Sequence, residues 1–348
     1  MNISSIFQKK KNIDFLSIGD IVVDAFIKID AAAEITDNGT SKKICIPFGE
    51  KVPFESVTEL VGVGNSANAS VSVARLHINS GLLTHTGNDY YGHKNKEVLE
   101  KDNVITDLVS TDDDKKTNYH YVLWHGDERT ILINHEKYDY KIPEQLTSGK
   151  IKPKYVYLSS LGENTLEFHH QLSRYLSQNP DIKLIFQPGT FQIKFGSEAL
   201  AELYKRTEIF FCNKEEAVKI LNAGEGHLDI EYLLKGLKDL GVRLPVITDG
   251  PHGSYTYDDA VIGKIIHVDI YPDIAPPVDR TGAGDGFAST FASAKYLGLD
   301  NRTALMWGSI NSMSVCQYVG AQEGLLSREK LENYLKTKPA SWEVETIN

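Results

Sequence analysis

A glycine-rich segment late in the chain carries the strongest chemical signal, Val278-Asp279-Arg280-Thr281-Gly282-Ala283-Gly284-Asp285-Gly286-Phe287. Gly282 and Gly284 flank an alanine, and such a loop can bring bare backbone N–H groups against an anion. The apolar spacing that begins at Phe287 predicts a helix directly after the loop. Because a helix N-terminus has unpaired N–H groups and a partial positive charge, the segment predicts an anion-binding site built without basic residues.

Asp285 lies where this loop meets the helix. An aspartate with an ordinary pKa of about 3.9 is ionised at neutral pH. Beside an anion hole, its carboxylate can accept the proton of a hydroxyl group that attacks a phosphoryl group. The residue alone equally fits a second interpretation, in which Asp285 only caps the helix.

The elements that position this loop follow from alternating apolar and helical stretches. From Lys154 onward, apolar runs such as Tyr155–Leu158 and Ile209–Cys212 alternate with helical patterns. This rhythm predicts an α/β fold with a parallel-rich central sheet flanked by helices. The first apolar run, Ile13 to Asp24, predicts one strand buried on both faces. The expected helices cover 166–176, 197–204, 215–221, 230–240, 284–297 and 302–318.

Two segments, at about 25–60 and 115–135, have a different pattern. Lys42 to Pro47 and Thr117 to Ile133 alternate between polar and apolar residues, as half-exposed strands do. Asn38-Gly39 and His125-Gly126-Asp127 supply turns. We expect the two segments to meet in a small sheet outside the main core.

Composition narrows the classes of partner. The chain has 348 residues and a formal charge of -10, so it has no general attraction for nucleic acid or anionic lipid. Its 3 cysteines form no CxxC pair, which indicates a reducing compartment. The start is polar and no apolar run could cross a bilayer, so we expect a cytoplasmic protein without a membrane partner. His169 and His170 are expected as a pair on a helix surface, because no third metal ligand has suitable spacing.

Several further motifs occur in a fixed order along the chain. They are Gly19 to Asp24, Gly62 to Ala69, Thr86 to Gly92, Asn213 to Glu216 and Thr248 to Ser254. With the segment around Asp285, they resemble the ribokinase-like (PfkB-type) carbohydrate kinase family from about residue 13 to 335. Taken alone, only the Asp285 segment is a specific signal for this family. Taken together and in this order, the motifs are specific for it.

The resemblance implies a single ribokinase-like domain over residues 12–340, in which the segments at about 25–60 and 115–135 form a small β lid over the substrate. It also implies an ATP-dependent kinase that phosphorylates a hydroxymethyl group of a small-molecule sugar or nucleoside. Asp285 would be the base, and Gly282, Ala283 and Gly284 the anion hole. The acceptor would be bound by Asp24, Gly64, Asn65 and Asn68. Asn213 and Glu216 would organise the phosphates and Mg²⁺, with Glu216 acting through water, and Thr248, Gly250 and Gly253 would border the nucleotide.

Three features leave the acceptor open. The first Gly-rich motif lacks the adjacent glycines and the lysine of ribokinase itself, which argues against ribose. Gln187-Pro188-Gly189-Thr190 stands where relatives often carry Asp-x-Asn, and Arg280 can either reach phosphate or pair with Asp279. An adenosine-type nucleoside is therefore an alternative to a sugar. Dependence on a monovalent cation such as K⁺ and a homodimer through the lid edges also stay open.

Two other classes of protein deserve comparison. Gly62-x-Gly64-x-x-Ala67, with Asp89 further along, also fits a relaxed dinucleotide-binding fingerprint, which would indicate an NAD-dependent oxidoreductase. That hypothesis leaves the Asp285 loop and Asn213–Glu216 without a role. A non-catalytic sugar-binding regulator would have no use for both Asp285 and its glycines. A kinase is therefore favoured.

Overall fold

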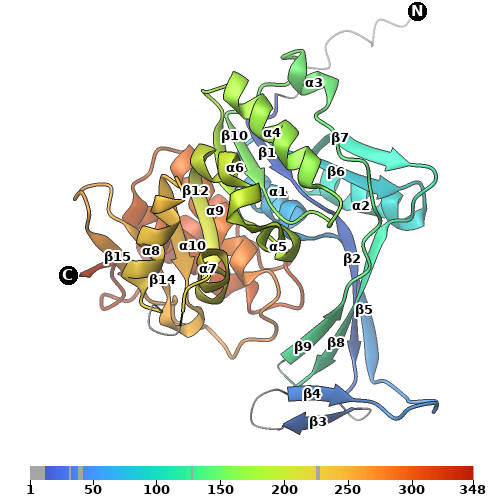
Figure 1. Ribbon diagram of the computed structural model, residues 1–348. Helices are drawn as coiled ribbons and strands as arrows, with labels where there is room; N and C mark the ends of the chain where they lie inside the picture. Colours follow the sequence, from blue (N-terminus) through green and yellow to red (C-terminus); the bar gives the residue numbers. More distant parts are fainter. Residues whose placement is uncertain (1–11, 31–32, 38–41, 127, 225–227, 348) are drawn as a thin grey trace, which may run out of the picture.

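The computed structural model describes residues 12–30, 33–37, 42–126, 128–224 and 228–347. Its centre is a ten-stranded sheet (Figure 1). In spatial order the strands are β16 (Glu345–Ile347), β15 (Ile265–Val268), β14 (Ser254–Tyr257), β13 (Leu244–Thr248), β12 (Thr207–Asn213), β11 (Lys183–Phe186), β10 (Tyr155–Leu158), β1 (Phe15–Ile18), β6 (Ser80–Gly87) and β7 (Ile105–Asp112). The strands from β7 to β13 pair in parallel, and the three at the other edge pair antiparallel. The predicted parallel-rich sheet is confirmed.

Helices cover both faces of this sheet. One face packs against α4 (Leu166–Gln178), α5 (Thr190–Ala199), α6 (Ala201–Arg206), α7 (Lys214–Leu221) and α8 (Ile230–Asp239). The other packs against α1 (Asn65–Arg75), α9 (Ala283–Tyr296), α10 (Asn301–Val315) and α11 (Arg328–Lys336), with α2 (Tyr90–Lys101) beside α1. A short α3 (Glu144–Thr147) and a 3-10 turn, η1 (Gly250–His252), lie in connections.

The β12 strand shows why the apolar runs are nearly continuous. Phe210 and Cys212 face the core under α7 and α8, whereas Ile209 and Phe211 face α9. Alternate side chains of a strand point to opposite faces, and both faces here are buried. Every position must therefore be apolar, which makes such strands readable in the sequence.

Strands from the two atypical segments form a second, four-stranded sheet in the order β5-β2-β8-β9. It contains β2 (Val22–Lys28), β5 (Ser56–Val63), β8 (Asn118–His125) and β9 (Glu128–Leu132), and it projects away from the central sheet (Figure 1). The expectation that Lys42 to Pro47 joins this sheet is wrong. Instead β4 (Lys42–Cys45) pairs only with β3 (Glu34–Asp37) in a separate two-stranded sheet. The predicted turn at Asn38-Gly39 and Asp127 of the hairpin lie outside the described residues.

The first predicted strand is also corrected. The run from Ile13 to Asp24 divides into β1 of the central sheet and β2 of the small sheet. The chain turns at Gly19, where a Cβ would lie 2.7 Å from Ser159 Oγ, so only glycine fits. The next residue, Asp20, is buried and accepts a hydrogen bond from the Tyr140 hydroxyl at 2.8 Å. A buried carboxylate that is paired in this way fixes the bend between the two sheets.

Two further expectations are corrected. The single helix expected over 197–204 is two helices, α5 and α6, and α5 is interrupted at Gly196, whose φ is 85°. His169 is not on the surface but fully buried, where its Nδ1 donates to the Thr165 carbonyl at 2.7 Å. Burial lowers the pKa of His169 to about 4, so this histidine is neutral. Among the residues that the structure describes, no group of three or more metal-ligand side chains is arranged to hold an ion.

Candidate active site

Two predicted site residues lie at the carboxyl ends of the parallel strands, since Asn213 ends β12 and Thr248 ends β13. Gln187, which was not predicted as a site residue, directly follows β11. The N-terminal turn of α9, with Asp285, lies beside these strand ends in one pocket. Ligand sites in open α/β sheets form at this edge, because loops from several strands converge there. The fold thus brings together residues that are more than sixty positions apart in the sequence.

Asp285 is buried and is held by three side-chain amides. Asn65 Nδ2 donates to its Oδ1 at 2.8 Å, and Asn68 Nδ2 donates to its Oδ2 at 2.8 Å. Gln187 Nε2 donates to Oδ1 at 3.2 Å. The Tyr157 hydroxyl donates in turn to Gln187 Oε1, so the glutamine must present its NH₂ group to the carboxylate.

The charge state of Asp285 depends on two opposing effects. Burial raises the pKa of the carboxyl above its ordinary value, and the hydrogen bonds from Asn68, Asn65 and Gln187 oppose that rise. All three donors favour the ionised form, because an ionised carboxylate accepts hydrogen bonds and donates none. The three amide donors thus favour the ionised form of a buried carboxylate, which is the form that a general base requires.

The loop before Asp285 is fixed by a second aspartate. The Asp279 carboxylate accepts hydrogen bonds from the backbone N–H and the hydroxyl of Thr281 at 3.0 and 2.7 Å, and from Gly320 N at 2.9 Å. Gly282 has φ 79°, and a Cβ there would lie 2.1 Å from Ala321 Cβ. A Cβ on Gly284, by contrast, would meet nothing within 4 Å. Gly282 is therefore needed to shape the turn, whereas Gly284 faces open space.

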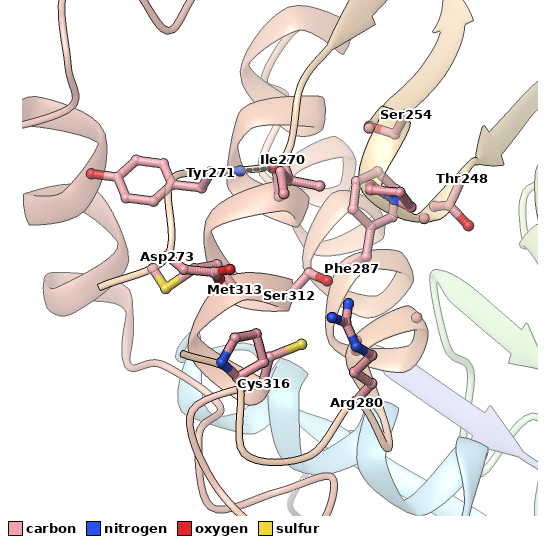
Figure 2. Close-up of a pocket in the computed structure, with 17 residues that line it drawn as sticks. Thr248, Ser254, Ile270, Tyr271, Asp273, Arg280, Phe287, Ser312, Met313 and Cys316 are labelled. Carbon is pink, nitrogen blue, oxygen red and sulfur yellow. Dashed lines mark hydrogen bonds between the residues drawn. The ribbon is translucent and has the colours of Figure 1, made fainter. Parts of the chain in front are cut away.

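Two adjoining pockets open from this loop. The larger, of about 330 Å³, is lined by the predicted nucleotide residues Thr248, Gly250 and Gly253, together with Ala283 and Gly284 (Figure 2). Figure 2 shows the Arg280 side chain extending along its wall toward Phe287.

The second pocket, of about 230 Å³, contains Asp285. It is lined by Asp285, Glu216, Asn213, Arg280 and Arg129, and it shares Thr248, Gly284 and Phe287 with the first pocket. Asp279 forms an ion pair with Arg129, whose Nη1 is 3.9 Å from Oδ1, and no ion pair joins it to Arg280. Arg129 from β9 and Arg280 from the loop before α9 both line the cavity that contains Asp285.

Asn213 and Glu216 form a capping box at the start of α7. Asn213 Oδ1 accepts from Glu216 N at 2.8 Å, and Glu216 Oε2 accepts from Asn213 N at 2.9 Å. Burial raises the pKa of Glu216, and the charge of nearby Asp285 adds to the rise. Both residues also line the second pocket. The same two side chains therefore cap α7 and lie where the sequence analysis predicted residues that organise the phosphates.

The predicted acceptor residues divide between two places. Gly64 begins α1 with φ 110°, where a Cβ would lie 2.8 Å from the Asp20 carbonyl, so it packs against protein. Asn65 and Asn68 bind Asp285 itself. Asp24 lies on β2 of the small sheet, where its Oδ1 is 3.2 Å from His120 Nδ1.

Sequence reasoning missed several residues of this region. Gln187 and Arg129 were not proposed as part of the site, although Gln187 directly follows β11 and the position after a parallel strand is a signal for a site residue. His120 and His135 gave no signal, because each is an isolated histidine in a strand or a loop. Only the fold brings them beside Asp24 and Asp20.

The fold and this site define a class of phosphotransferase with a ribokinase-like architecture. A family model described as pfkB family carbohydrate kinase matches residues 26–328. The chain belongs to the pfkB family of carbohydrate kinases, and it is a carbohydrate or nucleoside phosphotransferase.

Named relatives illustrate the range of that family. A nucleoside kinase of Methanothermobacter thermautotrophicus is 25% identical over 320 residues, which cover 90% of this chain and 92% of the relative. The structure of Arabidopsis thaliana ribokinase complexed with ribose and ATP has a TM-score of 0.76 and 19% identity, with 94% and 100% of the two chains covered. A putative ribokinase II from E. coli in complex with ATP and Mg²⁺ has a TM-score of 0.69 and 19% identity, covering 93% and 99%.

Proposed function

We propose that this protein transfers the γ-phosphoryl group of ATP to a hydroxymethyl group of a sugar or a nucleoside, with Asp285 as the base. The observation that carries the proposal is the buried Asp285 carboxylate, held by three amide donors directly beside the open N-terminal turn of α9. The first backbone N–H groups of a helix lack intrahelical acceptors, so those of Gly284 and Asp285 are available to an anion.

The larger pocket fits a nucleotide. Gly250 has φ 51° and open space at its Cβ position, and Gly284 is likewise open, so backbone lies bare along one wall. The remaining lining is mainly apolar, with Phe287 and Met313 among small polar residues. A planar base and a polyphosphate chain need this combination of apolar wall and exposed amides.

The chemical step follows from these positions. Asp285 accepts the proton of the acceptor hydroxyl, whose oxygen forms a bond to the γ-phosphorus as the bond to the leaving ADP oxygen breaks. The N–H groups around Gly282 to Gly284, with Arg280 and Arg129, stabilise the charge that develops on the phosphoryl oxygens. Mg²⁺ would neutralise phosphate charge, and Glu216, which lines the same pocket as Asp285, would hold it through water.

The small sheet is proposed to act as a lid over the acceptor. Arg129 of β9 lines the pocket that contains Asp285, and Asp24 is on the same sheet. A cover of this kind would exclude water from the phosphoryl group and suppress hydrolysis of ATP.

The test is a panel of sugars, polyols and nucleosides incubated with ATP and Mg²⁺, with ADP formation as the readout. The nucleoside kinase relative, which matches over nine tenths of both chains, favours testing nucleosides beside pentoses and hexoses. Acceptor-dependent ADP formation that Asp285→Asn abolishes would support the proposal. A correctly folded wild-type protein that binds a panel member but forms no ADP would instead be a binding protein.

A further inference from the structure

Gln322, in the connection between α10 and α11, contacts one of the amides that hold Asp285. Its Nε2 donates to the Gly62 carbonyl at 2.7 Å and to Asn68 Oδ1 at 3.1 Å. Asn68 Nδ2 in turn donates to Asp285 Oδ2 at 2.8 Å. Gln322 lines neither of the two pockets that adjoin the Asp285 loop, so its link to Asp285 is through Asn68.

The two ends of this chain of contacts fix the orientation of both amides. A backbone carbonyl can only accept, so the NH₂ group of Gln322 must face Gly62. The same NH₂ group lies beside Asn68, which must therefore turn its carbonyl oxygen toward Gln322. The NH₂ group of Asn68 is left to face Asp285. The orientation of Asn68 is thus set from outside the pockets, whatever the charge on Asp285.

Gln322 is itself anchored in the fold. Its backbone carbonyl accepts from Arg75 Nη1 at 2.6 Å, and Arg75 Nε is paired with Asp102 at 2.7 Å. Two residues earlier, Gly320 packs so closely on β5 that a Cβ there would lie 2.1 Å from the Leu60 side chain. Because the connection is held in this way, Gln322 cannot easily follow a turn of the Asn68 amide.

The other oxygen of Asp285 has a similar but weaker arrangement. Gln187 Nε2 donates to Asp285 Oδ1 at 3.2 Å, and the Tyr157 hydroxyl donates to Gln187 Oε1. A hydroxyl group can also accept a hydrogen bond, whereas the Gly62 carbonyl cannot donate one. Of the two constraints, the one that Gln322 imposes is therefore the stricter.

The fixed orientation of Asn68 matters once Asp285 has taken up a proton. A carboxylic acid has an O–H donor, and an amide that turned freely could accept from it through its carbonyl oxygen. In this protein the turn would bring the Asn68 NH₂ group against the NH₂ group of Gln322, so that two donors would face each other. The neutral acid is thereby denied an acceptor at Asn68, and the ionised form is favoured.

We propose that Gln322 is a positioning residue for the base, which locks the Asn68 amide as a donor and so disfavours the protonated form of Asp285. The inference rests on the proposed function and deepens it, because it assigns a residue outside the two pockets that controls the protonation of the base.

The titratable and charged groups that face Asp285 come from several elements. They are Tyr157 on β10, Cys212 on β12, Glu216 on α7, Arg129 on β9 and Arg280 in the loop before α9. Gln322→Met changes no charge and removes none of these groups, so its effect on Asp285 reports the contact with Asn68.

The first test follows Asp285 in the whole free protein, without turnover. ¹³C-carboxyl spectra of aspartate-labelled protein, with the Asp285 signal assigned from Asp285→Asn, report its protonation across a pH titration. Gln322→Met has a side chain of similar length but no donor, so Asn68 can turn and accept from the protonated acid. We expect the titration midpoint of Asp285 to rise by about half to one pH unit, the effect of one hydrogen bond. An unchanged midpoint would overturn the proposal.

Two comparisons distinguish this role from a purely structural one. Gln317→Met makes the same change earlier in the same connection, where the amide donates to the Ala275 carbonyl at 3.1 Å, and should keep the wild-type midpoint. In an Asn68→Ala background, Gln322→Met should have no further effect, because the amide that it locks is absent. A shift that persists without Asn68 would contradict the proposal.

The second test measures kcat/KM for the acceptor against pH. The acidic limb of Gln322→Met should move upward by the same amount as the ¹³C midpoint, with the ATP KM unchanged. Gln322→Glu should move the limb further, because the new carboxylate accepts from Asn68 Nδ2, draws it from Asp285 and adds a negative charge nearby. A folded Gln322→Glu variant with its acidic limb at the wild-type pH would also overturn the proposal.

These results separate the positioning role from the proposed function. If no acceptor is phosphorylated at any pH, the proposed function fails, whereas the ¹³C titration still decides whether Gln322 controls the protonation of Asp285. If an acceptor is phosphorylated and Gln322→Met changes the ATP KM but leaves the acidic limb in place, Gln322 only shapes its connection, and the positioning role is refuted.

Discussion

The two sides of the active site are built from different materials. On the proposed phosphoryl side, bare backbone at Gly250 and Gly282 to Gly284 lines the cavities together with the side chains of Arg280 and Arg129. On the proposed acceptor side, a chain of charged and polar side chains runs from Asp24 through two histidines to Asp20 and Tyr140. Asp285 lies between the two sides and is held by amides.

This difference has a chemical reason. A transferred phosphoryl group is the same for every acceptor, so the same helix N-terminus and the same two arginines would serve it whatever the acceptor is. Acceptors differ in the placement of their hydroxyl groups, and only side chains can match that placement. A scaffold that changes its acceptor would therefore keep the glycines and change the side-chain network.

The largest effect is expected where the two sides meet. Asp285→Asn should lower kcat by roughly 10²–10⁴, the usual contribution of a general base, because the amide cannot accept the hydroxyl proton. ATP and acceptor dissociation constants, measured by calorimetry, should change little. A folded Asp285→Asn variant with wild-type kcat would show that Asp285 is not the base.

Asp24→Ala should act on the acceptor side alone. Loss of two hydroxyl hydrogen bonds of about 1.5–3 kcal/mol each should raise the acceptor Kd by roughly 10²-fold or more, with the ATP Kd unchanged. The control is Asp30→Ala, two residues beyond β2, where the carboxylate accepts from Gly126 N at 2.8 Å and forms an ion pair with Lys28 at 3.3 Å. If calorimetry showed an unchanged acceptor Kd, the acceptor would not bind at Asp24 of the small sheet.

The same contrast explains what could be predicted from the sequence. The Asp285 loop and the strands of the central sheet are local patterns, in which neighbouring residues specify a turn, a helix start or a buried strand. The network of His120, His135 and Asp20 is not local, since its members are separated by up to 115 positions in the chain. The spacing of these residues along the chain does not indicate that they are in contact.

Pairing of strands shows the same limit. The alternation in Lys42–Cys45 correctly indicated a strand, but alternation does not specify a partner, and β4 pairs with β3 rather than with the small sheet. The break of the first strand at Gly19 was missed because the run from Ile13 to Val23 is apolar on both sides of it. Its cause is a close approach to Ser159, which is distant in sequence.

Two neighbouring glycines give a matched test of the phosphoryl side. Gly284→Ala has space for its Cβ, so the protein should fold with a wild-type Tm, but the methyl group enters the cavity and should lower kcat on the order of tenfold to hundredfold by displacing the phosphoryl group. Gly282→Ala places its Cβ 2.1 Å from Ala321 Cβ and should lower the Tm as well. Full activity of Gly284→Ala would mean that the phosphoryl group does not approach this turn.

A smaller effect should appear in the pH profile of kcat/KM. Burial raises the pKa of Asp285, and activity requires its ionised form, so activity is present above that pKa and is lost as the pH falls through it. Asn68→Ala removes one amide donor that opposes the rise, and a lost hydrogen bond to a charged group corresponds to an upward shift of about one pH unit in the acidic limb. The matched control is Ser72→Ala, one turn further along α1, where the hydroxyl contacts Thr290 instead of Asp285. Its acidic limb should stay at the wild-type pH. If Asn68→Ala left the acidic limb at the wild-type pH but changed the acceptor KM, Asn68 would contact the acceptor and would not tune the pKa of Asp285.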